Sequence, residues 1–132
     1  MGQAPRADLS GVFPVLPTPF GDDGTLDIGS LDRLLEHALR WRSHGIAVLG
    51  VASEVEKLRP EEYEAVAELA LRKIDGRMPV IMGVSAPDPK IAARQAAHAR
   101  HVGAAVVFAK SPPPSTPRAA EVELVQYFTA IA

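Results

Sequence analysis

Four short apolar runs recur along the chain, separated by stretches with a mixed polar pattern. They are residues 12–16, 46–49, 80–82 and 104–108. None of them alternates with polar residues, which is typical of strands buried on both faces of a parallel sheet. Their starts recur roughly every 25–35 residues, the size of one strand–helix unit.

The stretches between and after these runs have the apolar spacing of amphipathic helices, with neighbours at i, i+3, i+4 and i+7. We expect helices near residues 31–38, 60–74, 90–102 and 117–131. The third is alanine-rich. The apolar positions are Leu31, Leu34, Leu35 and Ala38 in the first helix, Tyr63, Val66, Ala67, Ala70 and Ile74 in the second, and Leu124, Val125, Phe128 and Ile131 in the fourth.

Proline and glycine mark the expected ends of these helices. Three helices carry proline in the first turn, where its missing N–H would have no partner inside the helix. Asp88 and Thr116 can also cap free amide groups there. Three helices are expected to end at glycine, which accepts the left-handed conformation that closes a helix. The prolines are Pro60, Pro89 and Pro117, and the glycines are Gly45, Gly76 and Gly103.

These elements predict an α/β fold of four units, (βα)₄, with parallel strands and outer helices. Two architectures fit: a small doubly wound sheet, or half of a TIM (βα)₈ barrel, whose full length is about 250 residues. A nucleotide-binding wound sheet usually has a glycine-rich phosphate loop after its first strand. Residues 18–24 lack that pattern, and the adjacent acids Asp22 and Asp23 would repel a phosphate.

The composition of the chain argues against several classes of function. The chain has 132 residues, 47% of them hydrophobic, so it can bury the core of one domain. Its 14 Lys and Arg residues against 16 Asp and Glu residues give a net charge of −2, and only 5% are aromatic. Both values argue against nucleic-acid binding. The chain has no cysteine, which excludes disulfides and thiolate chemistry and is compatible with the cytoplasm, where we expect it.

Residues 1–10 lack the apolar stretch of a secretory signal, and we expect a flexible arm there. No apolar run approaches the ~18 residues of a membrane span, so we expect no membrane partner.

Four motifs follow one another along nearly the whole chain from Gly11 onward. They are GVFPVLPTPF and GTLD within residues 11–27, LGVASE at 49–54, GRMPVIMGV at 76–84, and the segment 103–112 that begins GAA. In this order and spacing they resemble the dihydrodipicolinate synthase / N-acetylneuraminate lyase family. The resemblance implies a (βα)₈ barrel and a class I aldolase, lyase or dehydratase that acts on pyruvate or another 2-oxo acid. In that family a lysine forms a Schiff base with the substrate ketone, and no cofactor is needed.

The resemblance also assigns residues. Val51, Ala52 and Ser53 occupy the positions that bind the substrate carboxylate, and Glu54 is expected to support their loop. The family normally has two hydroxyl residues and a glycine where this chain has Val51, Ala52 and Ser53. Its catalytic tyrosine and lysine lie on the fifth and sixth strands. Residues 11–132 would therefore be a half-barrel that stops before both and carries no catalytic residue.

Other reactive side chains have plainer interpretations. Lys110, at the end of the fourth apolar run, could form an imine, but the family's lysine lies two strands later and we expect a loop lysine. His98 and His101 are spaced i, i+3 as in some metal sites. Their neighbours are arginines and alanines, so we expect no metal. The family's Pro-Tyr-Tyr segment is replaced by Pro112, Pro113 and Pro114, which we interpret as a rigid loop.

Two functions from different classes remain open. One is the lyase or aldolase that the resemblance implies, with a small 2-oxo acid as partner. The other is a non-catalytic (βα)₄ binding or scaffolding domain. In a half-barrel the first and fourth strands of the four units would be unpaired, so we expect a homo-oligomer or self-association through open sheet edges.

Overall fold

Three parallel strands form an open sheet in the computed structural model, which describes residues 9–116 and 119–132. The strands are β1 (Ile46–Val48), β2 (Val80–Gly83) and β3 (Val106–Phe108), and their spatial order is β1-β2-β3. Val48 pairs with Met82, which pairs in turn with Val107. Most of the expected arm at residues 1–10 lies outside the described residues.

The first apolar run is not a full strand, contrary to expectation. It lies parallel to β1 through a single bridge between Val15 and Ala47. The Leu16 N–H donates to the Ala47 carbonyl, and the Ala47 N–H donates to the Pro14 carbonyl, both at 2.8 Å. Pro14 and Pro17 have no N–H to donate, and this limits the ladder on this edge.

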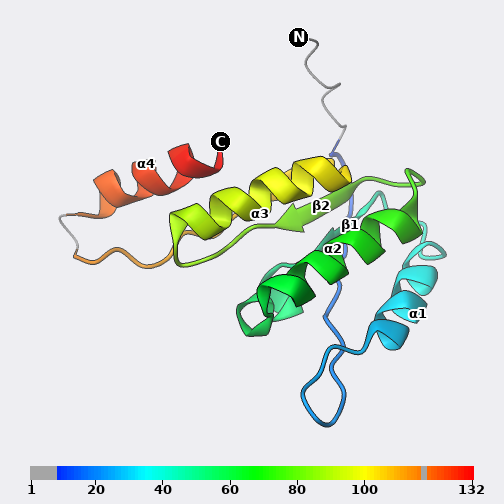
Figure 1. The fold of residues 1–132 in the computed structure, drawn as a ribbon. Helices are drawn as coiled ribbons and strands as arrows, with labels where there is room; N and C mark the ends of the chain where they lie inside the picture. The colour runs from blue at the N-terminus through cyan, green and yellow to red at the C-terminus, as the bar shows by residue number, and fades with distance from the viewer. Residues whose placement is uncertain (1–8, 117–118) are drawn as a thin grey trace.

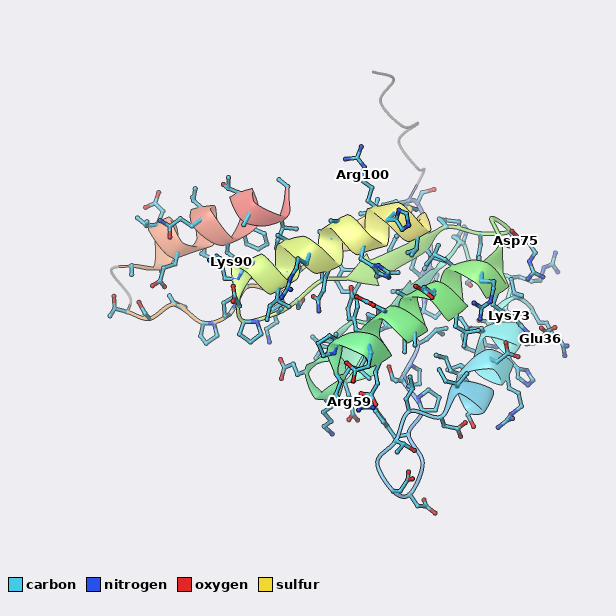
Figure 2. All side chains as sticks on the ribbon, viewed as in Figure 1. Glu36, Arg59, Lys73, Asp75, Lys90 and Arg100 are labelled. Carbon is cyan, nitrogen blue, oxygen red and sulfur yellow. The ribbon has the colours of Figure 1, made fainter. Side chains whose placement is uncertain are left out.

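Four helices follow the expected order: α1 (Ile28–Ala38), α2 (Pro60–Ile74), α3 (Pro89–Val102) and α4 (Ala120–Ile131). Each packs against the next, α1 on α2, α2 on α3 and α3 on α4 (Figure 1). At the α1–α2 contact the Lys73 ammonium lies 3.0 Å from Asp32 and 3.1 Å from Glu36 (Figure 2). Hydrogen bonds to these carboxylates raise the pKa of Lys73.

The helix starts are mostly as predicted. Pro60 and Pro89 are the first residues of α2 and α3, and the Asp88 carboxylate accepts the Lys90 N–H at 2.8 Å. The fourth helix starts later than expected, at Ala120, although the Thr116 hydroxyl still accepts the Ala119 N–H. Pro117 lies outside the described residues.

The glycine ends are only partly as predicted. Gly103 closes α3 in the left-handed region at φ 95°, and Asp75 and Gly76 share that role after α2. The expectation for Gly45 is wrong, because α1 ends at Ala38. An ideal Cβ at Gly45 would lie 2.3 Å from the Phe13 ring and 2.5 Å from the Pro79 carbonyl, so this glycine provides room.

The core lies between the sheet and the helices, and it thins toward the C-terminus. Leu31, Leu35 and Ile74 are almost fully buried, as their spacing predicted. In α4 the expected apolar face is largely exposed, and the buried residue is Tyr127. β3 is the last strand of the sheet, so this helix packs mainly on α3. The exposed apolar residues of α4 are Val122, Leu124, Val125 and Phe128.

Candidate functional site

A cavity of about 380 Å³ lies where the loops after the three strands meet. Its walls come from Val51 and residues 54–57 after β1, residues 85–87 after β2, and residues 110–113 after β3. Parallel strands bring their carboxyl ends to one edge, and this is where α/β proteins bind ligands. This cavity is the candidate site.

A tight turn after β1 forms one side of this cavity. Val51–Ser53 is a 3₁₀ helix, here the η1 turn. The Ser53 N–H donates to the Gly50 carbonyl and the Glu54 N–H donates to the Val51 carbonyl, both at 3.0 Å. The first N–H groups of such a turn, those of Val51 and Ala52, have no partner inside it. The exposed Val51 side chain lines the cavity, so the turn offers backbone donors beside an apolar wall.

Ser53 is held away from the cavity. The residue is 1% exposed, and its hydroxyl donates to the Leu16 carbonyl at 2.5 Å. The hydroxyl therefore ties the η1 turn to the segment beside β1. Val51 lines the cavity, whereas Ala52 and Ser53 are not among its lining residues. The resemblance had grouped these three residues, and the structure gives them different surroundings.

Glu54 forms a local ion pair with Lys57. Its backbone has a φ of 53°, and its carboxylate lies 2.5 Å from the Lys57 ammonium. Both side chains are about half exposed or more. Such surface pairs contribute little, about 0–1 kcal/mol. Glu54 and Lys57 both line the cavity and partly neutralise each other there.

Lys110 lies on the opposite wall. Its backbone N–H donates to the Ser85 hydroxyl at 2.8 Å, which joins the loops after β2 and β3. The Tyr127 hydroxyl donates to the Ala86 carbonyl at 2.9 Å and accepts the Ala86 N–H at 3.3 Å. The loop after β2 is therefore fixed from two sides.

A feature that the sequence did not indicate lies at the end of β1. Leu49, expected as a strand residue, has a φ of 59° and is fully buried. Its carbonyl lies against Gly83 of β2, where an ideal Cβ would be 2.0 Å away. The buried Tyr63 hydroxyl donates to the Gly83 carbonyl at 2.8 Å, and burial raises the pKa of this tyrosine. In the sequence, Gly83 followed by Val84 does not indicate the contact between Gly83 and Leu49.

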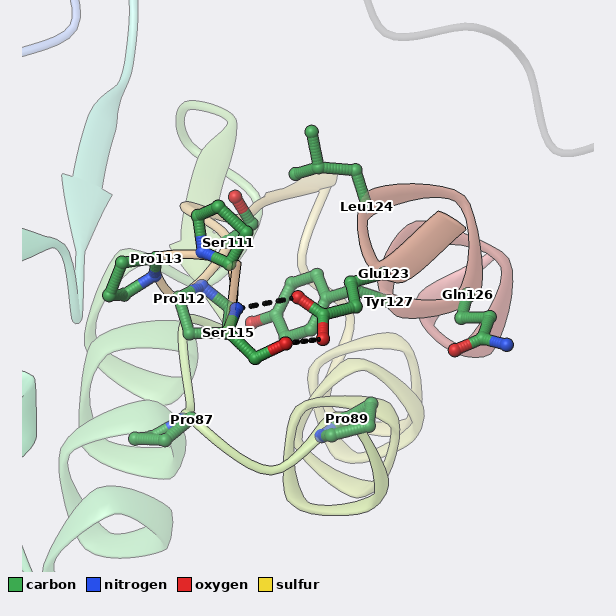
Figure 3. A pocket seen from close by; sticks show the side chains of 11 residues that line it. Pro87, Pro89, Ser111, Pro112, Pro113, Ser115, Glu123, Leu124, Gln126 and Tyr127 are labelled. Atoms are coloured by element: carbon green, nitrogen blue, oxygen red, sulfur yellow. Dashed lines mark hydrogen bonds between the residues drawn. The ribbon is translucent and has the colours of Figure 1, made fainter. Parts of the chain in front are cut away.

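The loop after β3 borders a second cavity of about 350 Å³ (Figure 3). Pro112, Pro113 and Pro114 form part of its wall, in an irregular segment. The Ser115 N–H and hydroxyl both donate to the Glu123 carboxylate, at 2.8 and 2.5 Å, and these bonds lower the pKa of Glu123. The proline segment is thus tied to the first turn of α4.

The histidines do not gather into a metal site. His98 lines a third cavity of about 460 Å³ between α2 and α3, where its Nε2 atom and the Gln95 Oε1 atom are buried without a hydrogen-bond partner. His101 is exposed on α3. In residues 9–116 and 119–132, no group of three or more His, Asp or Glu side chains is arranged to hold a metal ion.

In the described part of the chain, no helix has the length and apolar character needed to cross a bilayer.

Comparisons with known proteins give one consistent result. Residues 8–132 match the model of the dihydrodipicolinate synthetase family. The chain is 35% identical over 124 residues to 4-hydroxy-tetrahydrodipicolinate synthase of Xanthomonas campestris pv. campestris, covering 94% of this chain and 40% of that protein. It is 30% identical over 123 residues to L-2-keto-3-deoxyarabonate dehydratase of Azospirillum brasilense, covering 92% of this chain and 40% of that protein.

A solved structure gives the same picture. The fold matches a prophage protein of the dihydrodipicolinic acid synthase family from Escherichia coli K12, in complex with pyruvate, with a TM-score of 0.84 and 27% identity. The match covers 96% of this chain and 42% of that protein. The chain therefore spans about two fifths of the length of these relatives. The expected fold class, a (βα)₄ half of a TIM barrel, is confirmed.

Proposed function

This chain belongs to the dihydrodipicolinate synthetase family, and from that premise we propose that the protein is a lyase, aldolase or dehydratase that acts on pyruvate or another 2-oxo acid. Its relatives include a synthase and a sugar-acid dehydratase, and one relative has been solved with pyruvate. The proposed chemistry is a Schiff base between a lysine and the substrate ketone.

The position of the η1 turn carries this proposal. The turn follows β1 directly and lies at the edge where the three strands end, beside the 380 Å³ cavity. It presents the N–H groups of Val51 and Ala52, which are donors of the kind that binds a carboxylate. In the proposed site these two amides hold the carboxylate of the 2-oxo acid, and Glu54 supports the loop.

The side chains of the turn point to an altered substrate. Two aliphatic residues stand at the hydroxyl positions, and the Ser53 hydroxyl is already bonded to Leu16. Carboxylate binding would rest on the backbone amides alone. The remainder of the substrate would lie against Val51 and the loops that carry Lys110 and Pro112.

We assign no catalytic residue to these 132 residues. The proposed catalytic tyrosine and Schiff-base lysine belong to the fifth and sixth strands of the barrel that the resemblance implies. The chain by itself should therefore lack lyase and aldolase activity. The proposal further includes the cytoplasm as the compartment, no cofactor, and a homo-oligomer as the assembly.

The test is to express the reading frame beyond codon 132 beside the 132-residue chain. Each protein is incubated with pyruvate and borohydride, and adducts are mapped by mass spectrometry. Activity is assayed with pyruvate and a panel of aldehydes, and with 2-oxo-3-deoxy sugar acids. The longer protein should be trapped at a lysine after residue 132 and should turn over at least one substrate. A longer protein that neither traps pyruvate nor turns over would instead support a non-catalytic (βα)₄ binding or scaffolding domain.

A further inference from the structure

We propose that Leu49 is a positioning residue: its left-handed backbone, held against Gly83, sets the direction in which the η1 turn enters the cavity. The identity of the ligand rests on the proposed function. The backbone conformation of Leu49 is observed in the structure and does not depend on that function. Because Leu49 is held in this conformation, the amide groups of Val51 and Ala52 keep one fixed orientation for binding.

Leu49 differs from the other non-glycine residues with positive φ in the described ranges. Arg42, Glu54 and Asp75 are exposed residues of loops and helix ends. Leu49 directly follows a strand and has no exposed surface. A bulky side chain is a rare occupant of this backbone region, so the surroundings must hold it there.

Gly83 provides the room for this conformation. An ideal Cβ at Gly83 would lie 2.0 Å from the Leu49 oxygen and 2.7 Å from the Leu49 carbonyl carbon. Gly83 itself is fixed, because its carbonyl accepts the Tyr63 hydroxyl and its backbone pairs with Phe108. The Leu49–Gly50 peptide therefore rests on a part of the sheet that cannot move away.

The η1 turn is thus fixed at both ends. At its start, Gly50 lies close to the Phe108 ring and to Val15, with 3.0 and 3.3 Å from an ideal Cβ to their nearest atoms. At its end, the Ser53 hydroxyl is bonded to the Leu16 carbonyl. Val51 and Ala52 lie between these two anchors, so a change at Leu49 should redirect their N–H groups.

The experiment compares Leu49→Ile with Leu49→Met in the full-length protein. Both changes nearly conserve volume, but only isoleucine is branched at Cβ, and branched residues strongly disfavour positive φ. Leu35→Ile is the matched control, because Leu35 is equally buried but lies inside α1. Gly83→Ala pushes the same peptide from the other side. The readouts are the pyruvate dissociation constant and amide hydrogen exchange at Ser53 and Ala47.

Leu49→Ile and Gly83→Ala should weaken pyruvate binding about tenfold or more and speed exchange of the Ser53 N–H. Exchange of the Ala47 N–H, which reports the strand, should stay unchanged. Leu49→Met and Leu35→Ile should resemble the parent. Unchanged binding in Leu49→Ile, or an equal loss in Leu35→Ile, would overturn the inference. If the parent binds no pyruvate, the proposed function fails, and unchanged Ser53 exchange in Leu49→Ile would then overturn the role of Leu49 separately.

Discussion

Two aliphatic residues of the η1 turn, Val51 and Ala52, occupy positions at which the resemblance implies hydroxyl residues in the family. Restoring them with Val51→Thr and Ala52→Thr in the full-length protein should strengthen pyruvate binding. A hydrogen bond to a charged group contributes roughly 1.5–3 kcal/mol. Calorimetric titration with pyruvate checks this, with Val122→Thr on exposed α4 as the control. Equal or weaker binding would mean that the pocket is shaped for another substrate.

Lys110 is the lysine closest to the strand ends by position, and we expect it not to form a substrate imine. It is exposed, and neither tyrosine lines its cavity: the Tyr63 hydroxyl donates to Gly83, and the Tyr127 hydroxyl donates to Ala86 and reaches only the Lys110 carbonyl, at 3.5 Å. After incubation of the 132-residue chain with pyruvate and borohydride, peptide mapping should find no more adduct at Lys110 than at Lys57, Lys73 and Lys90. A selective adduct at Lys110 would make it a nucleophile in its own right.

Whether a residue-scale feature could be predicted from the sequence depends on how far apart in the chain the interacting residues lie. The Asp88 cap and the Pro60 and Pro89 starts depend on neighbours in sequence, and they were predictable. The conformation of Leu49 depends on Gly83, and the bond of Ser53 depends on Leu16, both more than thirty residues away. No spacing rule connects such residues before the fold is known.

At the scale of elements, the buried residue of α4 is Tyr127. The Tyr127 hydroxyl satisfies both the N–H and the carbonyl of buried Ala86. Tyr127→Phe should leave these groups unpaired and cost about 1–3 kcal/mol of unfolding free energy. Val125→Ala, at an exposed position of the same helix, should change stability by less than about 0.5 kcal/mol. Urea denaturation of both variants measures the difference, and equal midpoints would show that the hydroxyl contributes nothing.

The predicted bounds of elements were wrong where contacts with distant residues outweighed local sequence preferences. Gly45 was expected to end a helix, but Phe13 and Pro79 occupy the space that any side chain there would need. The first predicted strand forms only one bridge to β1, because Pro14 and Pro17 have no N–H to donate to the hydrogen-bond ladder. The apolar spacing of α4 predicted a helix correctly but not the face it buries, since the sheet ends at β3.

At the scale of the whole molecule, an open edge should make the 132-residue chain self-associate. β3 ends the sheet, and Val106 on it is 38% exposed. An unpaired apolar edge is a template for another chain, and each 100 Å² of apolar surface buried adds about 2.5 kcal/mol. Light scattering over a tenfold dilution series should show an apparent mass that decreases as the chain is diluted. A constant 14.1 kDa monomer would contradict this.

A pair of variants locates the contact. Val106→Lys places a charge on the edge of β3 and should shift the chain toward the monomer. Val122→Lys places the same charge on exposed α4. If only the second variant dissociates the assembly, the helix face rather than the strand edge holds the copies together.

The order of the strands in space equals their order in the chain, β1-β2-β3, and each helix packs on the one before it. Every new unit therefore finds its partner already present when it leaves the ribosome. Synthesis proceeds from the N-terminus at about 5–20 residues per second, which is slow compared with the formation of a helix. The nascent chain can thus assemble this sheet one unit at a time. Up to β3, each strand pairs with a segment that has already been translated.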